Sequence, residues 1–280
     1  MKTTIINFCP TGMIPDKSQT PFVPVSSAEI IEQVQEAYEL GITIAHLHAR
    51  EDNGQPSYRK TVYRDIFEGV KKYCPDLVIC ASSSGRSFPE FEKRSAVIEL
   101  QPDMCSLTLS SLNFFQQASV NTPDMISMLA QKMLEFGVKP ELECFDMGMI
   151  NYGKYLIQKN ILQPPFYWNL LFGNIAGFQA NLSQMAAAAN ELNGNDHFIA
   201  FGGVGQAQFK ANSVALVMGY GVRIGLEDNI WFDKARKIKA KNIELLKRIH
   251  ALMEIHENRL LSSSEFGKFG FYNAHTLARL

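Results

Sequence analysis

Alternation between short apolar runs and longer helix-like segments is the feature that most constrains the fold of this 280-residue chain. The short runs are rich in β-branched residues, and most of the longer segments carry apolar residues three and four positions apart, which is typical of helices that cover a sheet. Eight strands are predicted, at Thr3–Phe8, Ile42–His48, Leu77–Ser82, Met104–Leu109, Glu141–Phe145, Phe166–Phe172, His197–Phe201 and Val222–Gly225. The predicted helices are Ser27–Glu39, Thr61–Tyr73, Phe88–Glu99, Asp124–Phe136, Gly148–Lys159, Ser183–Leu192, Gln206–Met218 and Phe232–His256.

Start and stop signals agree with these segments. Ser26 followed three residues later by Glu29 is typical of a capped helix start, and Gly41 and Gly137 stand where helices are predicted to end. No linker or break in composition divides the repeats, so the pattern predicts an α/β protein with a single (β/α)8 TIM barrel. A doubly wound sheet is the alternative. It predicts fewer strands and usually a Gly-rich turn after the first, which Pro10-Thr11-Gly12 does not provide.

The barrel is predicted to occupy residues 1–258, and residues 259–280 form a C-terminal extension. This extension holds Phe266, Phe269, Phe271 and Tyr272. Exposed aromatic side chains at this density would be a liability on a monomer, so we expect them to pack on the barrel or on a neighbouring subunit.

Charge and composition exclude several classes of partner. The chain has 27 basic and 28 acidic residues, which gives no field for steering toward nucleic acid or an anionic membrane. The amino-terminal residues lack the apolar core and cleavage site of a secretory signal, and the five cysteines contain no CxxC pair. We therefore expect a cytoplasmic protein with buried free thiols, whose partners are small molecules or copies of itself.

A metal site is predicted at one end of the barrel. His46 and His48 are two positions apart on a strand, so they share a face, and imidazole nitrogen is a common zinc ligand. A catalytic zinc takes three protein ligands and keeps one open position. In a closed barrel the last strand lies beside the first, one strand away from the histidines, so Glu227 after the last strand is the natural third ligand.

Other polar residues fall at strand ends, where barrel enzymes place their chemistry. Arg223 and Asp228 flank Glu227, and an arginine can orient a carboxylate that acts as a general base. Hydroxyls, backbone amides and a carboxylate at other strand ends suit a substrate carboxylate, although each alone is more often a turn residue; these are Ser82, Gly85, Thr108, Ser110 and Glu143.

A Gly-rich turn follows the seventh predicted strand and opens a helix. Its residues Gly203, Gly205 and Gln206 could let backbone N–H groups approach a phosphate, as barrel phosphate sites do. A tight strand-to-helix connection explains the same glycines equally well. Spacing alone leaves both interpretations open.

Six motifs together resemble the β-keto acid cleavage enzymes, the family of the 3-keto-5-aminohexanoate cleavage enzyme. The resemblance follows the order of the whole chain. The motifs are Pro10-Thr11-Gly12-Met13-Ile14-Pro15 with Thr20-Pro21, His46-Leu47-His48-Ala49-Arg50, Ser106-Leu107-Thr108 with Asn113-Phe114, Lys139-Pro140-Glu141-Leu142-Glu143-Cys144-Phe145-Asp146, Gly203-Val204-Gly205-Gln206-Ala207-Gln208 and Arg223-Ile224-Gly225-Leu226-Glu227-Asp228-Asn229.

The resemblance implies a zinc-dependent, tetrameric barrel enzyme that condenses a β-keto acid with acetyl-CoA and releases acetoacetate and a new acyl-CoA by a retro-Claisen step. It matches His46, His48 and Glu227 to the Zn²⁺ ligands. Arg223 and Asp228 match the pair that generates the carbanion. Further matches are Ser82 and Glu143 as supporting active-site residues, and Ser82, Gly85, Thr108 and Ser110 as substrate-binding positions. The Gly-rich turn, with Gly203, Gly205 and Gln206, is assigned to binding of the acetyl-CoA cofactor.

One departure bears on the substrate. In the aminohexanoate enzyme a glutamate two residues after the Thr-Gly pair meets the amino group of the substrate, whereas this chain has Ile14 there. Since an aliphatic side chain does not pair with an ammonium, we expect a β-keto acid that is neutral or apolar at its far end, with Arg86 leaving an anionic end open.

Two other classes of function remain open at this stage. A zinc-dependent aldolase or hydrolase that uses no CoA would need the predicted metal ligands but no phosphate cradle. A non-catalytic binding protein on a barrel scaffold would tolerate the loss of Asp228. The fold alone does not choose among these functions.

Overall fold

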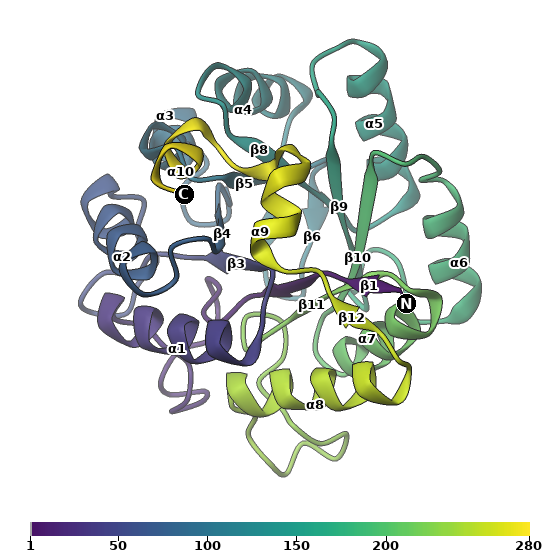
Figure 1. Cartoon of the computed structure of the whole chain (residues 1–280). Helices are drawn as coiled ribbons and strands as arrows, with labels where there is room; N and C mark the ends of the chain where they lie inside the picture. The colour runs from purple at the N-terminus through teal and green to yellow at the C-terminus, as the bar shows by residue number, and fades with distance from the viewer. Residues whose placement is uncertain (1) are drawn as a thin grey trace.

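A computed structural model of the chain describes residues 2–280, and it is a closed barrel of parallel strands surrounded by helices (Figure 1). The barrel order is β10-β11-β2-β3-β4-β5-β8-β9, which confirms the predicted (β/α)8 fold. Its strands are β2 (Ile6–Phe8), β3 (Ile44–Leu47), β4 (Val78–Ala81), β5 (Met104–Thr108), β8 (Lys139–Cys144), β9 (Phe166–Phe172), β10 (His197–Gly203) and β11 (Gly221–Ile224).

Helices follow the barrel strands as the periodicity predicts. The larger ones are α1 (Ser27–Leu40), α2 (Lys60–Tyr73), α4 (Pro123–Glu135), α5 (Met147–Gln158), α6 (Leu182–Asn190), α7 (Ala207–Met218) and α8 (Asn242–Ile255). The helix predicted at Phe88–Glu99 is the short α3 (Phe91–Ser95) continued by the 3₁₀ helix η1 (Ala96–Leu100). No helix in residues 2–280 is long and apolar enough to cross a membrane. All five cysteines are buried free thiols, as predicted.

The pairing of β2 with both β11 and β3 decides the geometry of the site. Arg223 is in register with Asn7, and Asn7 is in register with Ile44. The strand that carries the histidines is therefore one strand removed from the strand that leads to Glu227, as the closed barrel predicts.

Two predicted boundaries are wrong. The strand expected at Thr3–Phe8 is two strands, because only β2 joins the barrel while β1 (Thr3–Thr4) pairs with β12 (Arg259–Leu260). The helix expected at Phe232–His256 begins only at Asn242.

Local hydrogen bonds explain the late start of α8. Oδ1 of Asp233 accepts the N–H groups of Lys237 and Ile238 at 2.9 and 2.7 Å, and the N–H of Phe232 donates to the carbonyl of Ile238. The backbone groups that a helix would use are thus committed to a loop. A short antiparallel hairpin of β6 (Leu112–Asn113) and β7 (Ala118–Ser119) was also not predicted.

The last residues cover the amino end of the barrel, where the yellow α9 (Ser263–Phe266) crosses the opening in Figure 1. Phe266 and Phe271 are fully buried in a cluster with Ile44 and Met104 at the starts of β3 and β5. The π-helical turn η2 (Gly267–Phe271) and α10 (Ala274–Arg279) complete the segment. The division of the chain at residue 258 and the tetramer stay predictions.

Candidate active site

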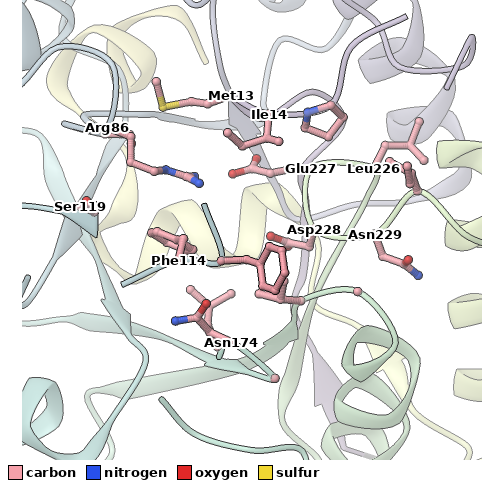
Figure 2. A pocket seen from close by; sticks show the side chains of 18 of the residues that line it. Met13, Ile14, Arg86, Phe114, Ser119, Asn174, Leu226, Glu227, Asp228 and Asn229 are labelled. Carbon is pink, nitrogen blue, oxygen red and sulfur yellow. The ribbon is translucent and has the colours of Figure 1, made fainter. Parts of the chain in front are cut away.

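A pocket of about 580 Å³ lies at the carboxyl ends of the barrel strands (Figure 2). It brings together predicted residues in or just after β3, β4, β5, β8, β10 and β11, although these are far apart in the sequence. The predicted site residues that line it are His46, His48, Ser82, Thr108, Glu143, Gly205, Arg223, Glu227 and Asp228.

Three of these residues converge on one point. Nε2 of His46 lies 3.3 Å from Nε2 of His48, and Oε1 of Glu227 lies 3.8 and 3.1 Å from these two nitrogens. A tetrahedral zinc with ligand bonds of about 2.0–2.1 Å places its ligand atoms about 3.3–3.4 Å apart. The three atoms therefore stand at nearly the separations that a shared Zn²⁺ requires.

The donor set also suits a divalent cation chemically. His46 and His48 are buried, and Oε2 of Glu227 is a buried oxygen with no hydrogen-bond partner in residues 2–280. Burial opposes the charge on Glu227, but Arg223 and the histidines hold its pKa well below the ordinary value. Burial lowers the pKa of His48 to about 4, so its imidazole is neutral near pH 7 and has a lone pair for a metal.

Glu141 is the residue that sequence reasoning missed. Oε2 of Glu141 accepts a 2.6 Å hydrogen bond from Nδ1 of His46, and Oε1 accepts bonds from Asn7 and Asn169 at 2.6 and 3.1 Å. Burial raises the pKa of Glu141, but His46 and Arg223 outweigh it and lower that pKa to about 2. The ionised carboxylate fixes the His46 tautomer and turns the Nε2 lone pair toward Glu227.

The sequence did carry a signal for Glu141. It stands two positions before Glu143, so the two carboxylates share a face of β8. The sequence predicts Glu143 as the site residue because it lies nearer the end of the strand. The barrel places Glu141 beneath His46 instead, fully buried.

Arg223 pairs with the two acidic residues that follow it. Its Nη2 donates to Oε1 of Glu227 at 2.7 Å, and its Nε donates to Oδ2 of Asp228 at 2.8 Å. Its Nη1 lies 3.7 and 3.5 Å from carboxylate oxygens of Glu141 and Glu143. One buried guanidinium thus orients Glu227 and Asp228 together.

Asp228 and Glu143 have the opposite electrostatic character from Glu227. Burial raises the pKa of Asp228 although Arg223 opposes this, and burial together with Glu141 raises the pKa of Glu143. A carboxylate with a raised pKa is a stronger base, and Asp228 lines the pocket where a substrate proton could reach it. The hydroxyl of Thr108 donates to Glu143 at 2.7 Å, so these two predicted residues act as a unit.

Two predicted substrate-binding residues stand back from the pocket. Ser82 and Thr108 line it, whereas Gly85 and Ser110 are not among the residues that form its wall. A Cβ atom on Gly85 would stand 2.7 Å from Nη1 of Arg94, so close packing is itself a reason for glycine at this position. Their roles toward a substrate stay predictions.

The Gly-rich turn has few free donors. The N–H of Val204 donates to Phe172, and the N–H of Gly205 donates to the carbonyl of Asp228 at 2.7 Å. Gly205 lines the pocket, but Gly203 and Gln206 do not. The turn therefore fixes the backbone of Asp228. Contact between the turn and CoA stays a prediction.

The loop after β2 closes one side of the pocket with the aliphatic Met13 and Ile14 (Figure 2). Arg50 holds this loop, since its Nη2 donates to the carbonyls of Gly12 and Pro15 at 2.6 and 2.9 Å. Gly12 has φ +67°, and a Cβ atom there would stand 2.5 Å from Cγ of Glu227. Glycine at this position is therefore what lets Glu227 reach the histidines.

Comparisons with known proteins identify a matching family. Residues 3–268 match the family described as beta-keto acid cleavage enzyme. The chain is 34% identical over 256 residues to the 3-keto-5-aminohexanoate cleavage enzyme of Fusobacterium nucleatum subsp. nucleatum, covering 89% of this chain and 90% of the relative.

A second relative and a solved structure extend the comparison. The chain is 31% identical to the 3-oxoadipate:acetyl-CoA acetyltransferase of Cupriavidus necator, covering 89% of this chain and 88% of that protein. The apo structure of ObcA superposes with a TM-score of 0.79 at 18% identity, covering 92% of this chain and 67% of that one, and this likeness shows the fold alone.

Proposed function

The chain belongs to the beta-keto acid cleavage enzyme family, and we propose that it uses acetyl-CoA to convert a β-keto acid into acetoacetate and a new acyl-CoA. The observation that carries this proposal is the pocket in which His46, His48 and Glu227 converge beside the Arg223–Asp228 pair. Relatives named as acetyl-CoA transferases of 3-oxoadipate, 3-dehydrocarnitine and 3,5-dioxohexanoate support it.

Zn²⁺ is the cation that fits the donor set best, because two imidazoles and one carboxylate leave a tetrahedral position free for substrate. Bound there, it would supply Lewis-acid chemistry, drawing electron density from the keto oxygen of the substrate. His46 and His48 would hold it through Nε2, and Glu141 would keep the His46 ring in position.

Asp228 is proposed as the base that takes a proton from C2 of the β-keto acid, the methylene between its keto and carboxylate groups. The Nε of Arg223 holds its carboxylate at 2.8 Å, and the backbone carbonyl of Asp228 is fixed by the N–H of Gly205. The resulting carbanion adds to the thioester carbonyl of acetyl-CoA and releases CoA thiolate. The thiolate then adds to the keto carbon, and cleavage of the bond between that carbon and C2 gives the new acyl-CoA and acetoacetate, which takes the proton back from Asp228.

The remaining residues orient the two substrates. The Ser82 Oγ accepts the N–H of Ser84 and keeps its own proton to donate to the substrate carboxylate. Glu143 and Thr108 are proposed to line the same side, and the Gly-rich turn is proposed to face CoA. Met13 and Ile14 offer no partner for an ammonium, so the amino-bearing acid of the Fusobacterium relative is not expected to be the preferred substrate.

The test incubates purified, metal-analysed protein with acetyl-CoA and a panel of β-keto acids and measures acetoacetate and acyl-CoA. Both products should form in equal amounts, and neither should form without acetyl-CoA. Consumption of a β-keto acid without acetyl-CoA would instead indicate an aldolase or hydrolase. No turnover of any panel member would contradict the proposal.

Metal binding is tested separately from turnover. His46→Ala should lose most of the bound zinc measured by elemental analysis, while His256→Ala removes an exposed histidine from the end of α8 and should lose none. Chelation should lower the melting temperature of the wild-type protein, since a ligand that binds the folded state stabilises it. Equal zinc content in both variants would contradict the assignment.

A further inference from the structure

Arg86 is a partly buried charged group of the pocket that the proposed chemistry does not use. It lies in the loop between β4 and α3, and its guanidinium points into the pocket (Figure 2). It makes no hydrogen bond and has no carboxylate oxygen within 4.0 Å among residues 2–280; Glu227, Glu143 and Asp228 act on it only as more distant charges.

The buried charges of the pocket are already matched, and Arg236, which also lines it, is exposed. Arg223 pairs with Glu227 and Asp228 at 2.7 and 2.8 Å, and Glu143 accepts the hydroxyl of Thr108. Arg86 therefore differs from Arg223, because it is a partly buried cation that no anion among residues 2–280 pairs with. Burial lowers its pKa, yet a guanidinium stays charged at neutral pH.

The surroundings of Arg86 hold it in place without neutralising it. Its Cζ lies 4.2 Å from the ring centroid of Phe114, a cation–π contact, and Met13 and Ile14 line the same pocket. None of these three neighbours carries a charge.

Hydrogen bonds from Arg94 fix the loop that carries Arg86. Buried Arg94 donates through Nε to the carbonyl of Ser83 at 2.9 Å and through Nη2 to Oδ1 of Asn121 at 2.7 Å. Arg94 also fills the space where a side chain on Gly85 would stand. Little ordering is thus needed when an anion binds, which favours affinity.

We propose that Arg86 binds a second anionic group at the far end of the substrate, so that the preferred substrates are β-keto diacids. This inference rests on the proposed function, in which every β-keto acid brings one carboxylate that Ser82 can bind beside the candidate metal site. Arg86 then remains free to bind a second carboxylate. The sequence predicts a neutral or apolar far end and leaves an anionic one open, and the unmatched guanidinium favours the anionic one.

Two six-carbon substrates that differ only at the far end test this inference. The wild-type kcat/KM with acetyl-CoA should be higher for 3-oxoadipate than for 3-oxohexanoate. Arg86→Gln should lower it about 10- to 100-fold for the diacid, mostly through KM, and change it little for the monoacid. Arg86→Lys keeps the charge but not the bidentate geometry of the guanidinium, so its kcat/KM for the diacid should lie between those of the wild type and Arg86→Gln. Arg236→Gln removes an exposed arginine from the same pocket and should leave the preference between the two acids unchanged.

Other results would overturn the inference. Equal losses for both acids would place Arg86 on the shared carboxylate, and a rise confined to the KM for acetyl-CoA would place it on a CoA phosphate. Loss of the preference in Arg236→Gln but not in Arg86→Gln would assign the subsite to the other arginine.

A binding measurement separates this inference from the proposed function. Adipate should raise the melting temperature of the wild-type protein more than hexanoate does, and Arg86→Gln should remove the difference. If no β-keto acid is turned over, the proposed function fails, but the adipate difference still supports the anion subsite. The absence of any difference in the folded wild-type protein would contradict the subsite.

Discussion

Glu141 lies directly behind His46, with Oε2 of the carboxylate 2.6 Å from Nδ1 of the imidazole. Both side chains are almost completely buried, and Asn7 and Asn169 fix the other carboxylate oxygen. The other ring nitrogen of His46, Nε2, is thereby aimed at His48 and Glu227. The geometry of the pocket thus depends on a residue that does not line it.

Replacement of this carboxylate should weaken metal binding without removing a ligand. Glu141→Gln keeps the shape but loses the charge that fixes the His46 tautomer, and removal of such a partner costs about 10- to 100-fold in metal affinity or activity. Zinc affinity measured by competition with a chelator checks this. Glu254→Gln, an exposed residue of α8, is the control and should match wild type. Unchanged affinity in Glu141→Gln would show that Glu141 is only structural.

Asp228 should matter for chemistry and not for the metal. Asp228→Asn keeps the hydrogen bond with Arg223 possible but removes the base, so kcat should fall about 10²- to 10⁴-fold. Zinc content should stay at the wild-type value. Acetoacetate assays with matched elemental analysis check both points, and full turnover by the variant would refute the general-base role.

Gly12 should be essential for the position of Glu227. Gly12→Ala places a methyl group 2.5 Å from Cγ of Glu227 and forces alanine into φ +67°. Gly54→Ala has the same kind of positive φ, +80°, with no atom within 4 Å, so it isolates the backbone cost. Each should be destabilised by about 1 kcal/mol or more in denaturant unfolding.

Only the Gly12 variant should also lose zinc affinity, which the same chelator competition measures. If the two variants bind zinc equally well, Glu227 reaches the histidines without the space that Gly12 provides.

The first helix should make an acid-dependent contribution to stability. Burial raises the pKa of Glu29, but Lys17 and the N–H groups of Val25 and Ser26 outweigh this effect and lower that pKa to about 2. The Glu29 side chain also closes the capping box of α1. A depressed pKa in the folded state means that this contribution is fully present above the unfolded pKa of about 4.3 and is lost as the pH falls toward 2.

Urea unfolding at several pH values checks this contribution. Glu29→Gln keeps a capping oxygen and should lose mainly the pH dependence in this window, while Glu29→Ala should lose about 1 kcal/mol more. An identical pH dependence in wild type and Glu29→Gln would contradict the linkage.

The fold was predictable because strand and helix periodicities are local properties. Eight repeats with capping signals suffice for a barrel, and the i, i+2 spacing of His46 and His48 puts both side chains on one face of β3. Phe232–Lys241 was predicted as helix because apolar spacing does not show that Asp233 binds the backbone N–H groups of a loop.

The candidate metal ligands were predictable for the same reason, because a closed parallel barrel gathers strand ends wherever they fall in the sequence. By itself the sequence determined the element order, the shared face of the histidines and the family motifs. Only the tertiary structure decided that Glu141 supports His46, that Gly12 makes room for Glu227 and that Arg86 has no anionic partner in the part of the chain that the structure describes. These are relations between side chains from different strands, and their distances depend on barrel closure and side-chain packing rather than on spacing along the chain.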